Sequence, residues 1–278
     1  MKDAMTQDQR LDALVEAFLA DAALPEQPEM PADPAGRRQL LRALMNVRPP
    51  RPLPEEVLHL QDAYLRERAA ERGVVTPDEI PSIARSLGSA RPFADRLSLW
   101  QGDITRLAAD AIVNAAHAAL LGCFRPCHDC LDNCIHPYAG VQLRADCDRR
   151  MQALRIRYGR GYEQPTAVPM LTEGYNLPAR KVVHIVGPIV EDRLTPRHER
   201  ELADCYRRTL ELCAEEGLRS VAFCGISTGV FRFPKERAAQ IAVQTVTDWL
   251  AQNEGRMDRV IFTVFSDGSR RIYERLLR

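Results

Sequence analysis

The sequence predicts an α/β fold: a three-layer α/β domain that follows a purely helical N-terminal segment. Two observations support this prediction. From about residue 95 onward, short apolar runs alternate with longer stretches of helical periodicity, which is the pattern of sheet strands joined by covering helices. Before about residue 90, only helical periodicity is found. We therefore expect a helical extension over residues 1–92 and an α/β domain over residues 93–278.

The elements of the N-terminal segment follow from local patterns. Two amphipathic stripes have the i, i+3, i+4 spacing of helices that bury one face; they consist of Leu11, Leu14, Val15, Phe18 and Leu19, and of Leu40, Leu41, Leu44 and Met45. The prolines of residues 48–54 end the second helix, because each removes a donor and restricts the residue before it. A third helix is predicted from Glu55, with an inward face of Leu60, Tyr64 and Leu65. Residues 76–79, Thr-Pro-Asp-Glu, have the cap, proline and glutamate of a helix start.

The α/β domain is predicted from apolar runs and the helical stretches between them. The expected strands are residues 97–100, 111–113, 167–170, 181–186, 220–224 and 259–265. Several of them are apolar on both faces, as buried strands are. The expected helices are residues 139–154, 197–216, 234–252 and 269–277. Because ligands of open α/β sheets bind beyond the carboxyl ends of the strands, the loops that follow strands are the places to search for chemistry.

Composition excludes several classes of protein. Lys plus Arg and Asp plus Glu both number 38, so the chain has no overall positive charge with which to hold nucleic acid or an anionic membrane. No window approaches the roughly 20 apolar residues of a membrane span, and the first residues lack the order of a signal peptide. We expect a cytoplasmic protein that binds neither membrane nor nucleic acid, with any anion site confined to a local loop.

The cysteines point to a metal. Four of the eight fall within residues 123–134, and such clustering with histidine in a long chain favours a zinc site over disulfides. There is no second CxxC pair, which favours few protein ligands and one open position, as in catalytic zinc. A closed structural site and a metal-free reactive thiol cluster are the alternatives. Spacing alone leaves open whether Cys127 reaches the metal.

Three loops after strands stand out. Residues 100–105, Trp-Gln-Gly-Asp-Ile-Thr, follow the first strand, and residues 114–117, Asn-Ala-Ala-His, follow the second. The third loop, residues 225–234, joins a strand to a helix through small residues. Its backbone N–H groups near a helix N-terminus suit a phosphate, although a plain tight turn would use the same residues. These loops are where we expect a ligand.

Taken in order, these motifs resemble a known family. GDIT, DAIVNAA, a Gly-Cys-x3-Cys-His-x-Cys insertion, DNCIH, GYNLPARKVVHIVGP and GISTGVFRFP are similar to the motifs of zinc-containing macrodomains, which are bacterial protein-ADP-ribosyl hydrolases. The resemblance implies a macrodomain three-layer α/β/α sandwich with a mixed central sheet. The helical N-terminal segment also resembles the extension usual in that family.

The resemblance also implies an ADP-ribose site. Asp103 would accept a hydrogen bond from the adenine amino group, with the Ile104 N–H close to the adjacent phosphate or ring. The diphosphate would be held by the N–H groups of Ser227, Thr228, Gly229 and Val230, and Phe231 would pack beside the distal ribose. From the residues alone, the alternatives are that Asp103 caps a turn, that Asn114 is a turn residue and that Asp132 caps the helix that follows.

At the distal ribose, the resemblance assigns the catalytic end. Asn114 and Asp132 would contact that ribose, where the modified protein is attached. Cys123, His128 and Cys130 match the family's zinc ligands, with one zinc per chain and a fourth position for water or substrate. His117 replaces the asparagine usual in macrodomains; it retains the ability to donate to a ribose hydroxyl or act as a base. His136 and His184 are expected to be structural.

The expected function is a zinc-dependent hydrolase of glycosidase or esterase type that removes mono-ADP-ribose from protein side chains, through Asp or Glu esters. Zinc would act at the distal ribose, on an oxygen of the scissile linkage or on a water. The alternatives are a non-catalytic ADP-ribose-binding module with structural zinc and an O-acetyl-ADP-ribose hydrolase. The resemblance suggests as partner a lipoyl-carrier protein, similar to the glycine-cleavage H protein, modified by a sirtuin-type ADP-ribosyltransferase.

Overall fold

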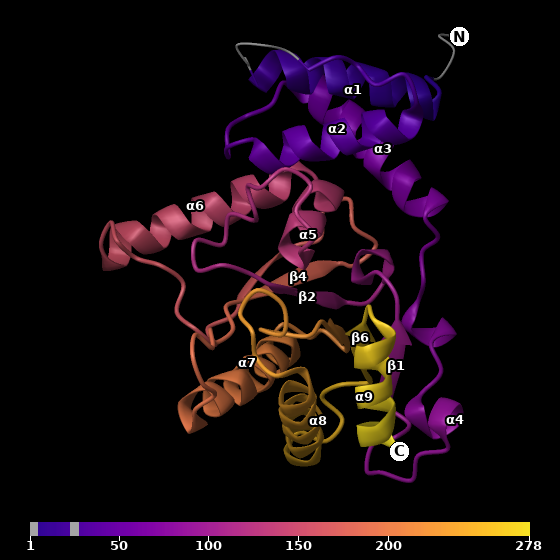
Figure 1. Cartoon of the computed structure of the whole chain (residues 1–278), viewed down its shortest axis with the longest axis vertical. Coiled ribbons are helices and arrows are strands. Elements are labelled where there is room, and N and C mark those ends of the chain that lie inside the picture. Colours follow the sequence, from indigo (N-terminus) through magenta and orange to yellow (C-terminus); the bar gives the residue numbers. More distant parts are fainter. Residues whose placement is uncertain (1–4, 23–27) are drawn as a thin grey trace.

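Three helices at the N-terminus form a bundle with its own apolar core. The computed structural model describes residues 5–22 and 28–278, and Figure 1 shows the bundle at one end of the molecule. Its helices are α1 (Gln7–Ala22), α2 (Pro34–Val47) and α3 (Glu55–Glu71). The two predicted stripes are confirmed, because their residues form the core of the bundle together with Tyr64 and Leu65. Leu40 and Leu60 lie at the edge of this core and are partly buried.

The rest of the chain is built on one six-stranded sheet of order β1-β6-β5-β2-β4-β3. The strands are β1 (Leu97–Gln101), β2 (Ala111–Ala115), β3 (Met170–Glu173), β4 (Lys181–Ile185), β5 (Ser220–Phe223) and β6 (Arg259–Val264). All neighbouring pairs are parallel except β3 with β4, which is antiparallel. The sheet is therefore mixed, and the predicted fold class is confirmed.

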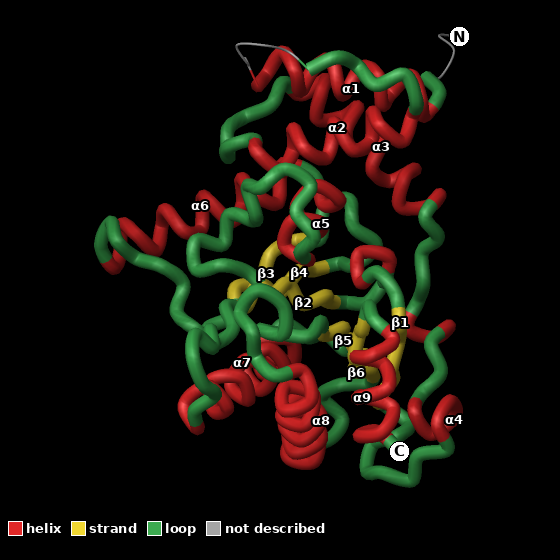
Figure 2. The backbone as a smooth tube through the Cα atoms, viewed as in Figure 1, coloured by secondary structure: helices red, strands yellow, loops and turns green. Residues whose placement is uncertain are grey.

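Helices cover both faces of the sheet (Figure 2). Those on one face are α7 (Pro196–Glu215), α8 (Lys235–Gln252) and α9 (Asp267–Leu277), and those on the other are α5 (Leu131–Ala139) and α6 (Val141–Tyr158). Neighbouring residues of β2 point to opposite faces, so Val113 joins the first core and Ile112 the second. Both faces are apolar, which explains why the central strands appear in the sequence as continuous apolar runs.

The connection from the bundle to β1 packs on the sheet. Val75 pairs with Leu107 in an isolated bridge, and Ile80 lies in the core under α5. Ile83, at the start of α4 (Ile83–Leu87), lies in the opposite core and is fully buried. By packing, residues from about 75 onward thus belong with the α/β layers. The division at residue 92 stays a prediction.

Three predicted elements are wrong in detail. The strand expected at 167–170 is β3, which begins at Met170 because Pro169 cannot donate to a sheet ladder. The helix expected at 139–154 is α6, which begins only at Val141 because Gly140 has a φ of 99°, outside the helical region, and Ala139 is the last residue of α5. The helix start at 76–79 has its capping box but forms only the short 3₁₀ helix η1 (Pro77–Glu79), because Pro81 disfavours helical backbone at the residue before it.

Within the described ranges, no helix has both the length and the apolar character needed to cross a membrane. The first four residues, on which the prediction of no signal peptide rests in part, lie outside these ranges.

Candidate functional site

The three loops singled out in the sequence lie at one edge of the sheet. Because β1, β6, β5 and β2 are parallel neighbours, their carboxyl ends share this edge. β1 and β2 are three strand spacings apart, about 14 Å. Loops from two of these strands meet directly: the rings of His117 and Phe231 are 5.9 Å apart at an interplanar angle of 87°.

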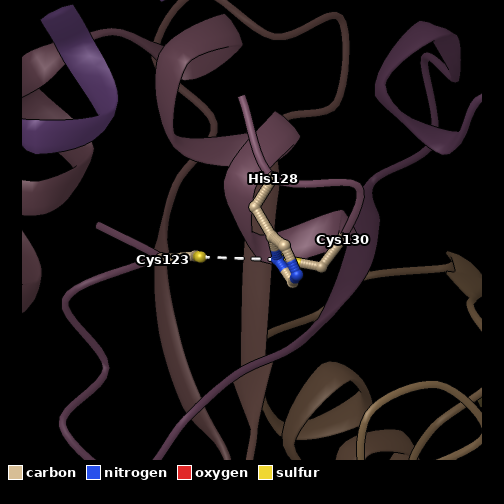
Figure 3. Close-up of side chains that lie close together, drawn as sticks. All are labelled: Cys123, His128 and Cys130. Carbon is tan, nitrogen blue, oxygen red and sulfur yellow. Dashed lines mark hydrogen bonds between the residues drawn. The ribbon is translucent and has the colours of Figure 1, made fainter. Parts of the chain in front are cut away.

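Cys123, His128 and Cys130 converge in residues 122–134, which comprise the end of the connection from β2 to α5 and the first turn of α5 and are here called the cysteine-rich loop (Figure 3). One ligand atom from each lies within 4.8 Å of the other two, and Cys123 Sγ is 3.6 Å from His128 Nδ1. A tetrahedral zinc with a thiolate at about 2.3 Å and an imidazole at about 2.0–2.1 Å also holds these atoms about 3.6 Å apart. The donor set and spacing fit zinc.

The remaining cysteines of the loop point elsewhere. Cys127 Sγ lies 3.4 Å from the carbonyl of Gln39 in α2, and Cys134 Sγ lies 3.3 Å from the guanidinium of Arg42. Neither belongs to the group formed by the three predicted ligands. The predicted ligand set thus comes together without Cys127, the point that spacing alone left open.

Local conformation explains why the loop can close. Gly122 has a φ of 77°, and a Cβ at this position would lie 2.7 Å from the His136 ring, so the turn before Cys123 requires glycine. The side chain of Asn133, which is fully buried, donates to the carbonyls of Cys123 and Arg125 at 3.2 and 2.7 Å. Hydrogen bonds from Asn133 therefore join the end of the loop to its beginning.

Two thiols of this loop, those of Cys130 and Cys134, do not have the chemistry of a reactive cysteine. Burial raises the pKa of the Cys130 thiol to about 12, and it also raises the pKa of Cys134. A nucleophilic thiol needs a lowered pKa, because the thiolate is the reactive form. This argues against a metal-free thiol cluster, whereas a bound cation would favour the thiolate.

Asn114, His117 and Asp132, the three predicted catalytic residues, form one hydrogen-bonded group. Asp132, in the first turn of α5, accepts from Asn114 Nδ2 at 2.8 Å and lies 3.3 Å from His117 Nδ1. Burial disfavours the charge of Asp132, but the nearby rings of His117 and of His136, whose Nε2 lies 3.4 Å from Asp132 Oδ1, outweigh it and hold the Asp132 pKa well below its usual range. The hydrogen bond to Asp132 in turn raises the pKa of His117, although partial burial opposes the shift.

Exposure divides these three residues by role. Asp132 is 2% exposed and Asn114 is fully buried, whereas the His117 side chain is 50% exposed. The amide oxygen of Asn114 is buried and accepts no hydrogen bond from any described residue. Of the three, only His117 is thus exposed to solvent, while the Asn114 oxygen is a buried acceptor without a partner and Asp132 is a buried carboxylate whose contacts are to other side chains.

A buried histidine fixes the orientation of the Asn114 amide. Burial lowers the pKa of His184 to about 3, so its ring is neutral. Its Nδ1 accepts from Asn114 Nδ2 at 3.1 Å, which leaves the proton on Nε2 to be donated to Thr172 Oγ1 at 3.0 Å. His184 also lies close to His136 and Cys147, but both its nitrogens already have partners. His184 is therefore held by hydrogen bonds, as expected for a structural histidine, whereas both ring nitrogens of His136 are buried without a hydrogen-bond partner among the described residues.

Asp103 lies at the far end of the edge, after β1. Its Oδ1 accepts from the N–H and hydroxyl of Thr105 at 3.0 and 2.7 Å, so Asp103 does cap the turn as the alternative interpretation expected. Its Oδ2 pairs with Arg72, the residue that follows α3 as its C-cap. The side chain remains 36% exposed, which leaves it accessible to a ligand. Capping and binding are thus compatible at this position.

Phe265 is a candidate site residue that sequence reasoning missed. It follows β6, beside the Asp103 loop, and is 83% exposed. The Gly102 N–H donates to the carbonyl of Val264, which ties the two loops together. An apolar residue at the end of an apolar run was assigned to the strand, and only its exposure distinguishes it. A bare aromatic ring at a sheet edge is a stacking surface.

The loop after β5 has the backbone of an anion site. Ser227 has a φ of 62°, and the Phe233 N–H donates to its carbonyl at 3.0 Å, which folds the loop back on itself. Among described residues, the N–H groups of Gly229, Val230 and Phe231 have no hydrogen-bond partner; that of Thr228 donates to Gly225 at 3.3 Å. Successive free N–H groups before the N-terminus of α8 suit a diphosphate.

Known proteins are similar to this chain along most of its length. The Macro domain profile matches residues 113–242. A protein-ADP-ribose hydrolase of Treponema medium is 43% identical over 98% of this chain and 100% of its own length, and one of Staphylococcus aureus (strain MSSA476) is 41% identical over 85% and 83%.

Solved structures give the same result. The Trypanosoma brucei macrodomain in complex with ADP-ribose is 27% identical, with a TM-score of 0.64, and the match covers 85% of this chain and 95% of that one. The Oceanobacillus iheyensis macrodomain with ADP is 38% identical with a TM-score of 0.56, covering 64% and 88%. Together with the full-length relatives, this similarity shows that the chain belongs to the Macro domain family.

Proposed function

We propose that this chain is a zinc-dependent hydrolase that releases mono-ADP-ribose from modified protein side chains. The observation that carries the proposal is the order of groups along the carboxyl edge. Asp103 and Phe265 lie at one end, the free N–H groups of the β5 loop in the middle, and His117 with the cysteine-rich loop at the other. This is the order adenine, diphosphate, distal ribose and linkage in ADP-ribosylated protein.

At the adenine end, Asp103 would accept from the amino group and Phe265 would stack on the ring. In the middle, the N–H groups of Gly229 and Val230 would bind the diphosphate, with that of Ile104 close to its adenine end. Phe231 would pack beside the distal ribose. These contacts would fix the ligand without touching the reacting bond, so they bind and orient it.

At the distal end, the free amide oxygen of Asn114 suits a ribose hydroxyl, because a buried acceptor without a partner gains a hydrogen bond there. His117 is exposed enough to touch the ribose or a water, and Asp132 holds its ring in place and favours its protonated form. Asp132 is therefore proposed to act through its neighbours. The substitution of His117 for the usual asparagine adds a group that can carry a proton.

Cys123, His128 and Cys130 would hold the zinc. Bound there, zinc would supply positive charge to stabilise a developing oxyanion at the linkage and would make a nearby water more acidic. Three protein ligands leave a tetrahedral ion one open position, the arrangement of catalytic sites. Asp132 follows Cys130 by two residues, so the ligands and the ribose-binding group lie on one short segment.

Ester-linked ADP-ribose on Asp or Glu is the proposed substrate, with a lipoyl-carrier protein modified by a sirtuin-type enzyme as the partner to test first. The test is incubation with an Asp- or Glu-ADP-ribosylated protein, with and without chelator, followed by mass spectrometry. Release of unmodified protein and ADP-ribose that stops with chelator supports the proposal. Binding without release points to a reader module, and activity confined to O-acetyl-ADP-ribose points to a small-ester hydrolase.

We predict that Asp103→Ala weakens ADP-ribose binding by about 1–3 kcal/mol, or about 5–150-fold, because the adenine amino group loses its charged acceptor. Calorimetry with free ADP-ribose measures the effect. Asp258→Ala is the matched control, since Asp258 pairs with Arg219 just before β6, at the opposite edge of the sheet. Unchanged affinity in the Asp103 variant would place adenine elsewhere.

A further inference from the structure

α2 has two buried faces with different chemistry. Leu41, Leu44 and Met45 pack in the core of the bundle. Arg42 and Asn46, one helical turn apart, face the cysteine-rich loop instead. Asn46 is fully buried and lies within the helix, where asparagine lowers helix stability. A buried amide at this position is stable only if hydrogen bonds satisfy its polar atoms.

Arg42 binds the loop at three points with one nitrogen. Its Nη2 donates to the carbonyl of His128 at 3.0 Å and to Asn133 Oδ1 at 2.8 Å, and it lies 3.3 Å from Cys134 Sγ. The first contact is to the backbone of a residue proposed as a metal ligand. The second orients the side chain that holds the carbonyl of Cys123. Arg42 is thus linked to two of the three ligands.

Asn46 uses both ends of its amide on the same loop. Nδ2 donates to the carbonyl of Asn133 at 3.0 Å, and Oδ1 accepts from the N–H of Cys127 at 3.0 Å. Cys127 has a φ of 49°, a conformation that costs a non-glycine residue free energy and persists only when its surroundings impose it. The bond from Asn46 fixes this strained position next to His128.

A third polar contact joins α2 to the start of the loop. Arg144 of α6 is 4% exposed; it donates through Nε to the carbonyl of Leu121 at 2.7 Å and through Nη1 to the carbonyl of Met45 at 2.8 Å. Its guanidinium also lies over the Phe124 ring, 4.4 Å from the centroid. If the bundle only covered the sheet, apolar side chains would make the contacts between them. The contacts described here are instead polar, and several of them are hydrogen bonds to backbone groups of the cysteine-rich loop.

We propose that Arg42 and Asn46 are positioning residues through which the N-terminal bundle holds the cysteine-rich loop in its ligand-binding shape and so sets its metal affinity. This inference rests on the proposed function, because it takes the loop to be a zinc site. Residues that support metal ligands from outside are worth about 10–100-fold in affinity. The bundle is then part of the metal site although it supplies no ligand among the three grouped residues.

The test compares full-length Arg42→Ala and Asn46→Ala with the wild type. Zinc dissociation constants are measured by competition with a chromophoric chelator, and loop protection by hydrogen exchange and mass spectrometry over residues 123–134. We expect zinc binding about 10–100-fold weaker, with faster exchange in the loop. Affinity for free ADP-ribose should change little, because the adenine and diphosphate contacts come from other loops.

Arg37→Ala is the control. Arg37 also lies on α2, but it pairs with Asp12 of α1 at 2.7 Å, within the bundle. If this variant loses zinc as strongly, the effect is bundle stability and the inference fails. It fails also if both test variants keep wild-type zinc affinity and loop exchange.

If the wild type binds no zinc, the metal centre of the proposed function is lost, and the exchange data alone decide whether Arg42 and Asn46 hold the loop. Arg42 is only half-buried, so its variant serves if Asn46→Ala does not fold.

Discussion

Replacing His128 with alanine is expected to lower the release of ADP-ribose from modified protein by about 10³-fold or more while leaving most of the affinity for free ADP-ribose. A catalytic metal supplies several kcal/mol of stabilisation to the transition state, and that contribution disappears with the ion. Adenine and diphosphate are held by loops after β1 and β5, which do not depend on the metal. Elemental analysis should show loss of zinc from this variant.

The control for His128→Ala is Cys127→Ala. Cys127 lies in the same loop, but its thiol faces Gln39 of α2 rather than the ligand group. This variant should keep its zinc and its activity. If the metal only staples the loop, His128→Ala should weaken ADP-ribose binding and turnover together. A metal-free protein that still turns over at the wild-type rate would rule out any catalytic role for zinc.

Asp132→Asn is expected to retain zinc and to lose about 10²–10⁴-fold in turnover, the usual contribution of a correctly placed proton-transfer group. The amide keeps the shape of the carboxylate but can no longer accept from both Asn114 and His117. One of the two must turn away, and His117 loses the charge that raises its pKa. Single-turnover kinetics on ADP-ribosylated protein, with zinc measured on the same sample, provide the test.

Asp129→Asn is the matched control, because Asp129 is an exposed carboxylate of the same loop. The Asp129→Asn variant should have the zinc content and the turnover rate of the wild type. Since Asp132 is buried, a thermal melt must show that the Asp132 variant is folded at the assay temperature. If the Asp132→Asn variant is folded, contains zinc and turns over ADP-ribosylated protein at the wild-type rate, Asp132 has no role in the reaction. The proposed arrangement of His117 by Asp132 would then also be wrong.

The fold could largely be predicted because its signals are local. Apolar runs such as 181–186 and stripes such as that of Leu11 and Leu14 depend only on neighbours in sequence. The proximity of the three proposed ligands could also be predicted, since they lie within eight residues of one another. Errors arose where one residue overrides a pattern, as Pro169 and Gly140 do.

What could not be predicted is long-range. Asn46 and Asn133 are separated by 87 positions in sequence, and nothing in the helix pattern of α2 marks Asn46 as a partner of the cysteine-rich loop. The pairing of Arg72 with Asp103 across 31 positions is of the same kind. The exposure of Phe265 depends on how the neighbouring loops lie. Such contacts are set by tertiary packing, to which single-sequence periodicity is insensitive.

The pairing of β1 with β6 has a consequence for how the protein is made. β1 is the first strand in the chain and β6 the last, yet they are neighbours in the sheet and Gly102 is tied to Val264. On the ribosome, the cysteine-rich loop and the N-terminal bundle emerge well before β6, but a domain generally folds as a unit. The adenine end can form only once residue 264 has emerged. A nascent chain stalled before that point should bind no adenine nucleotide.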